Sequence, residues 1–150
     1  MGSNKRPHAK PRRPQAAARS RRPPRQPSIA DLAHTVVRGG RELLALDDPL
    51  DAEAWASAMM GTFYKIDAPF EAREELDARL WPEVVRRAEA RADAAGLAVL
   101  EALSAVADAA LATDVRAAAV RLRSAGIAAP SWAADLGTGR TRASVAVHLY

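Results

Sequence analysis

Residues 97–111, LAVLEALSAVADAAL, decide the fold of this 150-residue chain. As a helix they are small or apolar on every side, and their only charges, Glu101 and Asp108, lie seven residues apart on one face with Ser104 between them. A helix of this composition is stable only when other parts of the protein cover it. The stretch therefore predicts a central, mostly buried helix over 97–111.

Toward the N-terminus, the first helix is predicted to begin at Ser28, where the composition changes abruptly. Residues 28–31, SIAD, have the form of a capping box, in which the first and fourth side chains satisfy free backbone amides. The inward stripe of this helix is expected to consist of Ile29, Leu32, Val36, Gly40 and Leu43. Glycine inside a helix is unfavourable by about 1 kcal/mol relative to alanine. Gly39-Gly40 therefore indicates either a neighbouring helix that crosses closely at Gly40 or a bend there.

The second helix is predicted to begin at Pro49, because proline suits the first helical position. Asp48, after Asp47, can cap this helix, and Asp51 with Glu53 favours the positive end of its dipole. These four carboxylates are thus explained without a metal ion. The buried face is expected to carry the aromatic anchor of the core, formed by Trp55, Met59, Phe63 and Ile66.

The third helix is predicted to follow the break Asp-Ala-Pro at 67–69. One of its faces is expected to hold Phe70, Arg73, Leu76 and Leu80, in which apolar residues recur at helical spacing. A second, solvated face holds Glu71, Glu74 and Glu75. Pro82 either opens a separate helix over 82–94 or kinks one long helix, because proline lacks the amide hydrogen that a helix interior uses.

After the central stretch, Thr113-Asp114 is predicted to cap a last helix over 114–125, which ends at Gly126. Its inward face is expected to hold Val115, Ala119, Leu122 and Ala125. Helices joined by short breaks predict a mainly α protein with antiparallel neighbours, either a helical bundle or a short α-solenoid with HEAT-like helix pairs. The alanine content, 36 of 150 residues, allows close approach of these helices.

The C-terminal residues 141–150 show the period of a β-strand rather than a helix. Val145, Val147 and Leu149 alternate with Ser144, Ala146 and His148. A single strand needs a partner, and none is evident earlier in the chain. The helical domain, residues 28–150, is therefore expected either to be the N-terminal part of a longer protein or to pair through this strand with another chain.

The N-terminal residues 1–27 are expected to form a disordered basic arm. The first 28 residues carry nine Lys or Arg and no acid, whereas residues 29–150 carry 13 bases and 18 acids. The net charge of +4 is therefore the sum of a basic arm and a body with a net charge of −5. Residues 4–27 contain six of the ten prolines and no Val, Ile, Leu, Phe, Trp or Tyr, so burial cannot offset the entropy of ordering them.

Each base of the arm could neutralise a phosphate, which predicts salt-sensitive, sequence-independent binding to nucleic acid, or attachment to an acidic protein surface. These candidate binding residues are Lys5, Arg6, Lys10, Arg12, Arg13, Arg19, Arg21, Arg22 and Arg25. The arm has no aromatic residue on which a base could stack. Other interpretations are a solubility tail, an arm folded back on the acidic body, an extension inherited from an arginine-favouring genome, and an SH3-type ligand at Pro11 and Pro14.

No pattern of an active site or cofactor site is present, so no catalytic residue, metal ligand or cofactor is predicted and an enzyme is the less favoured class. The chain has no cysteine, and its three histidines, His8, His34 and His148, share no motif. No metalloprotease, nucleophile-elbow or glycine-loop motif occurs. A signal peptide and an apolar run of 18 residues are also missing, which predicts no membrane attachment and a cytoplasmic protein.

Two segments carry a resemblance to a known group of proteins. Residues 47–57, DDPLDAEAWAS, and 126–137, GIAAPSWAADLG, resemble an uncharacterised alanine- and arginine-rich family typical of high-GC actinobacteria. The usage of 19 arginines and three lysines agrees with such an origin. The resemblance covers about residues 28–150 and implies that the protein continues past Tyr150, but the family brings no activity with it.

Three functional hypotheses follow from the sequence. The first is a non-enzymatic helical interaction or scaffold module, in which the arm provides electrostatic attachment and the body binds a specific protein partner. The second is the helical support region of an enzyme whose active site lies C-terminal to this chain. The third is self-association of the arm with the acidic body.

Overall fold

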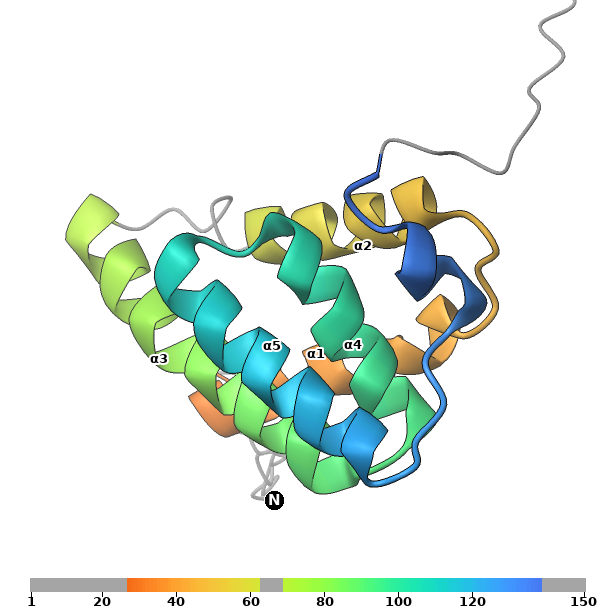
Figure 1. Cartoon of the computed structure of the whole chain (residues 1–150). Coiled ribbons are helices and arrows are strands. Elements are labelled where there is room, and N and C mark those ends of the chain that lie inside the picture. Colours follow the sequence, from red (N-terminus) through yellow and green to blue (C-terminus); the bar gives the residue numbers. More distant parts are fainter. Residues whose placement is uncertain (1–26, 63–68, 139–150) are drawn as a thin grey trace, which may run out of the picture.

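The computed structural model describes residues 27–62 and 69–138, which contain five α-helices and one short 3-10 helix (Figure 1). They are α1 (Ile29–Leu43), α2 (Pro49–Thr62), α3 (Phe70–Arg91), α4 (Ala94–Val106), α5 (Ala109–Ser124) and η2 (Ser131–Asp135). Helix α4 contacts each of the other four helices and η2, whereas in a solenoid each repeat contacts only its neighbours. The predicted mainly α fold is confirmed, and it is the helical bundle. The predicted strand at 141–150 lies outside the described residues.

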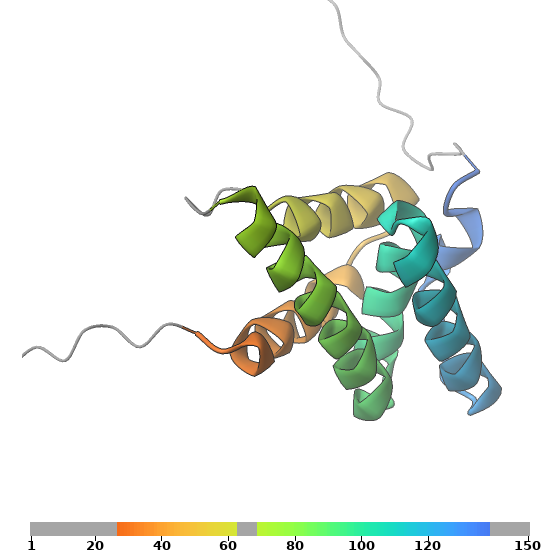
Figure 2. The same ribbon diagram turned by 90° about the vertical axis from the view of Figure 1, so that its left-hand side faces the viewer.

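Helices α3, α4 and α5 form an up-down-up array, and α2 lies across one end of it (Figures 1 and 2). Helix α1 packs against both α3 and α4. Figure 2 shows α3 and α5 running in the same direction. Together these elements enclose α4, as expected for the most apolar helix of the chain.

Helix α4 is the predicted central helix, and nine consecutive residues from Ala95 to Leu103 are buried in it. Its predicted end at 111 is wrong. The helix ends at Val106, Ala107 is extended, and the Asp108 side chain caps α5 by accepting a hydrogen bond of 2.9 Å from Leu111 N. An aspartate that can accept from free amides favours a new helix start over continuation of the old one.

The predicted cap at Thr113-Asp114 is also wrong, because both residues lie inside α5. Thr113 donates to the carbonyl of Ala109 one turn earlier, so its hydroxyl serves the helix interior. The inward positions Val115, Ala119 and Leu122 are confirmed as buried, whereas Ala125 is exposed. Gly126 follows the end of α5 with φ +87°, a conformation that glycine adopts readily.

Helix α1 begins with the predicted capping box. Asp31 N donates to Ser28 Oγ at 3.1 Å, and Ser28 N donates to Asp31 Oδ2 at 3.0 Å. The helix buries Val36, Gly40 and Leu43, while the predicted stripe residues Ile29 and Leu32 are half-buried. The capping box therefore fixes the start of α1, and the inward face of the helix is buried from Val36 onward.

Gly40 is the point at which α1 and α4 cross, which confirms the first of the two predicted alternatives. A Cβ atom at this position would lie 2.3 Å from Ala95 O and 2.8 Å from Val99 Cγ2. Both distances are shorter than non-bonded atoms tolerate. The helix backbones therefore approach each other more closely here than any residue with a side chain would allow.

Helix α3 is one long helix with Pro82 inside it, so the alternative of a separate helix at 82–94 is excluded. The side chains of its second half enter the core, with Leu80, Trp81, Val84, Val85 and Ala88 all buried. Its first turns lie further out, and Phe70 is 64% exposed. Glu71, Glu74 and Glu75 are exposed, as predicted for a solvated face.

The aromatic anchor of the core differs from the prediction. In α2 the fully buried residues are Ala52 and Ala56, while Trp55 and Met59 are half-buried, and Phe63 and Ile66 lie outside the described residues. Trp132 of η2 is the largest fully buried side chain, and its Nε1 donates to Leu43 O at 2.9 Å. The same carbonyl, at the end of α1, also accepts a hydrogen bond of 3.3 Å from Leu46 N, so Trp132 adds a second donor to it. Trp132 was missed because its partners are distant in sequence.

Candidate functional site

The predicted binding residues of the arm are not placed by the structure. All nine bases between Lys5 and Arg25 lie outside the described residues. The structure does place the point where the arm joins the body, which is the N-terminal end of α1 at Ser28. The surface beside this point is therefore the first place to look for a site that acts together with the arm.

A groove between α1 and α3 lies close to that end of α1. It has a volume of about 460 Å³ and is lined by His34, Val37, Arg86, Arg87, Ala90 and Arg91. Residues 34 and 37 are one turn apart on α1, and the α3 residues recur at helical spacing, so the contact between the two helices brings them together. We call this site the arginine groove. His34 is exposed.

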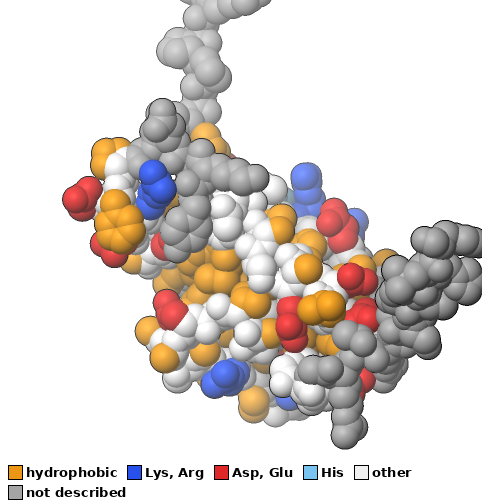
Figure 3. Space-filling view, turned by 90° about the horizontal axis from the view of Figure 1, so that it is seen from above, with side chains coloured by type: hydrophobic (Ala, Val, Ile, Leu, Met, Phe, Trp, Pro, Cys, Tyr) orange, Lys and Arg blue, Asp and Glu red, His pale blue; other side chains and the backbone are white. Residues whose placement is uncertain are grey.

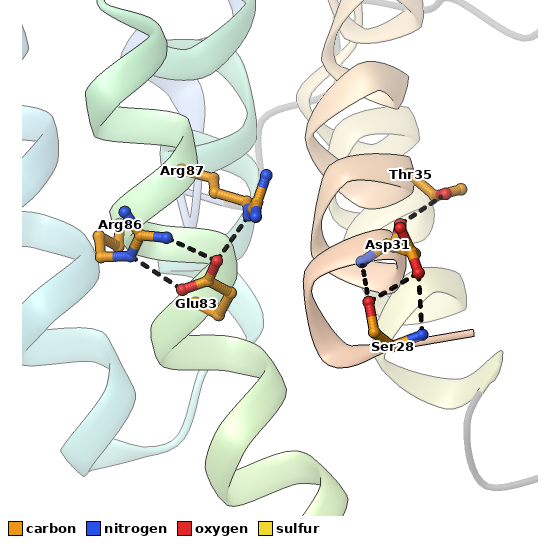
Figure 4. Close-up of polar contacts among 6 residues, drawn as sticks. All are labelled: Ser28, Asp31, Thr35, Glu83, Arg86 and Arg87. Atoms are coloured by element: carbon orange, nitrogen blue, oxygen red, sulfur yellow. Dashed lines mark hydrogen bonds and ion pairs between the residues drawn. The ribbon is translucent and has the colours of Figure 1, made fainter. Parts of the chain in front are cut away.

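Two of the groove arginines are held by one carboxylate, Glu83, one turn earlier on α3 (Figure 4). Arg86 donates through Nε at 2.8 Å and through Nη2 at 2.6 Å, and Arg87 donates through Nε at 2.6 Å. The hydrogen bonds from Arg86 and Arg87 lower the pKa of Glu83 from 4.5 to about 2, and the bond to Glu83 raises the pKa of Arg86. Glu83 and Arg86 therefore stay ionised at neutral pH.

The third arginine, Arg91, ends α3 and is held by Asp93 at the start of α4. Arg91 Nε lies 2.6 Å from Asp93 Oδ2, and Asp93 also accepts from Gly96 N at 2.8 Å as the cap of α4. Burial opposes ionisation of Asp93, but the bonds from Gly96 and Arg91 outweigh it and lower the pKa. Arg87 and Arg91 both bind their carboxylates through Nε, which leaves their terminal nitrogens available to another acceptor. Figure 4 shows Arg87 extending from α3 toward α1.

A second concave site, the acidic hollow, lies at the other half of α3. It has a volume of about 490 Å³ and is bordered by Glu74, Asp77, Asp108 and Asp114. Met60, Trp81 and Leu111 contribute apolar surface to it. Figure 3, which looks onto this end of the molecule, shows hydrophobic side chains between the outer end of α3 and the rest of the body. The hollow is suited to a cationic group with an apolar stem.

The charges of the body are distributed unevenly over the two sites. The described residues contain ten arginines and seventeen carboxylates, a net charge of −7. Half of the arginines lie on α1 and the second half of α3: Arg38, Arg41, Arg86, Arg87 and Arg91. The described body is therefore acidic as a whole, and half of its arginines lie on α1, where the arm ends, and on the part of α3 that packs near it.

The most buried charge of the described residues, Glu101 on α4, belongs to neither site. It is 3% exposed and accepts a hydrogen bond of 2.7 Å from Arg123 Nε on α5. A carboxylate in this position needs such a partner, because an unpaired buried charge is strongly unfavourable. The pair links α4 to α5 and has a structural role.

The part of the chain that the structure describes contains neither a group of metal-ligating side chains nor a membrane-spanning helix. Within 27–62 and 69–138, no three His, Cys, Asp or Glu side chains are grouped so that they could hold a metal ion. In the same ranges no helix has both the length and the apolar character needed to cross a membrane.

Comparisons with protein-family models, with curated proteins and with solved structures found no match to this chain. The resemblance to an actinobacterial family therefore stays a prediction. The arginine groove itself was missed in the sequence. Its signal is the spacing of Arg86, Arg87 and Arg91 after Glu83, but only the packing of α1 against α3 turns that spacing into a groove.

Proposed function

We propose that this protein is a non-enzymatic helical interaction module whose basic arm attaches it to nucleic acid, independently of sequence. The observation that carries the proposal is the separation of charge along the chain. Nine bases and no acid occupy the first 28 residues, and the described body has a net charge of −7. Guanidinium groups, which form seven of the nine cations, can bind phosphate oxygens in a bidentate way.

The attachment would work by neutralising phosphates and releasing their counterions. If all nine bases contacted duplex DNA, the logarithm of the binding constant would fall against the logarithm of salt concentration with a slope of about −8. The acidic body would be repelled by the same phosphates, except on the side of the arginine groove. Nucleic acid would therefore bind beside the arginine groove. The surface formed by α2 and η2 would stay available to a protein partner.

The test compares the full chain with residues 28–150 in fluorescence-anisotropy titrations of labelled RNA and duplex DNA at two salt concentrations. We expect the full chain to bind, binding to weaken steeply with salt, and residues 28–150 to lose most of the affinity. A full-length variant in which the nine arm bases are replaced by glutamine is the matched control, and it should behave like residues 28–150. Undiminished binding by residues 28–150 would refute the role of the arm. Binding to polyglutamate in place of nucleic acid would identify an acidic protein as the partner.

A second candidate is self-association of the arm with the body, and the acidic hollow favours it. Four carboxylates border this hollow, and the arm supplies cations with aliphatic stems. The measurement is titration of a peptide of residues 1–27 into residues 28–150. This candidate predicts association that weakens with salt and on replacement of Glu74 and Asp114 by their amides. Absence of association at low ionic strength would exclude it.

A further inference from the structure

We propose that the arginine groove binds a phosphate group of the nucleic acid that the arm engages, so that the body supplies contacts of its own. This inference rests on the proposed function and names the residues on the folded domain that take part in it. The contacting groups would be the guanidinium ends of Arg86, Arg87 and Arg91, with His34 on the facing helix.

The groove presents donors that are already oriented. Glu83 holds Arg86 and Arg87, and Asp93 holds Arg91, each at hydrogen-bonding distance. Arg87 and Arg91 are well packed, with 32% and 25% of their side chains exposed. Side chains that are fixed before binding lose less conformational entropy when the ligand arrives. Since both use Nε for their carboxylates, their terminal nitrogens can still donate to a phosphate oxygen.

The local charge agrees with an anionic ligand. Three arginines outnumber the two carboxylates that hold them, which gives the groove a positive balance on a body of net charge −7. Asp31, the acid of α1 nearest to His34 in sequence, is already engaged in the capping box with Ser28. A phosphate would therefore meet donors rather than an unpaired carboxylate.

The groove also lies where the arm begins. His34 is six residues after Ser28, which corresponds to about 9 Å along the axis of α1. A nucleic acid bound by the arm would thus be held at high effective concentration next to the groove. Even a weak contact in the groove would then contribute to the overall affinity.

The experiment measures the salt dependence of duplex-DNA binding by full-length single variants. Arg87→Gln and Arg91→Gln should each reduce the magnitude of the salt slope by about 1. Arg87→Lys, which keeps the charge, should retain the slope of the wild type. The matched control is Arg79→Gln on the same helix, whose side chain is 66% exposed and paired only loosely with Glu75 at 3.7 Å. This control should leave the slope unchanged.

The outcomes separate the two proposals. If the wild type binds with a steep salt slope but Arg87→Gln and Arg91→Gln bind as the wild type does, the groove is excluded and the role of the arm stands. If the wild type shows no salt-dependent binding, both proposals fall. Circular dichroism melts check that each variant is folded. Arg91 binds Asp93, which caps α4, so Arg91→Gln could unfold the chain; in that case Arg87→Gln alone tests the groove, because its partner Glu83 caps no helix.

Discussion

At the scale of single residues, glycines determine how closely the helices pack. Gly40 faces Ala95 O and Val99 Cγ2 of α4, whereas no atom of the described residues lies within 4 Å of the position of a Cβ at Gly61, near the end of α2. Both glycines lie in helices, so both lower the intrinsic helix stability by a similar amount. They differ only in what a methyl group would meet.

We therefore predict opposite effects of the same substitution at these two sites. Gly40→Ala should lower the free energy of unfolding by about 1–3 kcal/mol, because the added methyl group forces α1 and α4 apart. Gly61→Ala should raise the free energy of unfolding by up to about 1 kcal/mol, because alanine favours the helix. Urea unfolding monitored by circular dichroism measures both. A stabilising effect of Gly40→Ala would show that the crossing is not tight.

At the scale of helices, the sequence predicts where helices exist better than where they end. The capping box at Ser28 and the start at Pro49 are local signals, and both are confirmed. The boundary between α4 and α5 was missed because small apolar residues continue across it and hide the interruption at Asp108. The burial of Trp132 and the arginine groove depend on contacts between distant segments, which no local pattern encodes.

The corrected boundary can be tested through its caps. Asp108→Ala should lower the free energy of unfolding by about 1 kcal/mol, because Leu111 N loses its acceptor at the start of α5. Thr113→Ala is the control, and it should be neutral or slightly stabilising, because Thr113 lies inside the helix. Thermal or urea unfolding distinguishes them. If Thr113→Ala were more destabilising than Asp108→Ala, Thr113 rather than Asp108 would be the cap of the last helix.

At the scale of the whole molecule, ion pairs of α3 connect its parts. Glu89 binds Arg121 of α5, and Asp93 caps α4 while binding Arg91 of α3. Glu83 binds Arg86 and Arg87 within α3 itself. Hydrogen bonds from these arginines lower the pKa of Glu83 and Glu89, and bonds from Gly96 and Arg91 do so for Asp93 against the effect of burial. The free energy of unfolding of the bundle should therefore fall at acid pH.

The sign of this dependence follows from the direction of the shifts. A carboxyl group whose pKa is lower in the folded protein binds fewer protons there than in the unfolded chain, so its contribution to stability is present above the unfolded pKa and is lost as pH falls through the folded one. For Glu83 that window lies between pH 4.5 and about 2. We predict that the wild type is more stable than Glu83→Gln at neutral pH and that the difference shrinks across this window.

The measurement is the free energy of unfolding from urea titrations at several pH values between 7 and 2. Glu71→Gln is the control, because Glu71 is exposed and forms no ion pair among the described residues, so at neutral pH it should change the free energy of unfolding less than Glu83→Gln does. A difference between the wild type and Glu83→Gln that persists at the acid end would mean that Glu83 stabilises the protein by packing rather than by charge. The ion pairs of Glu83 would then add nothing measurable to stability, and the orientation of Arg86 and Arg87 in the arginine groove would have to come from the contact between α1 and α3.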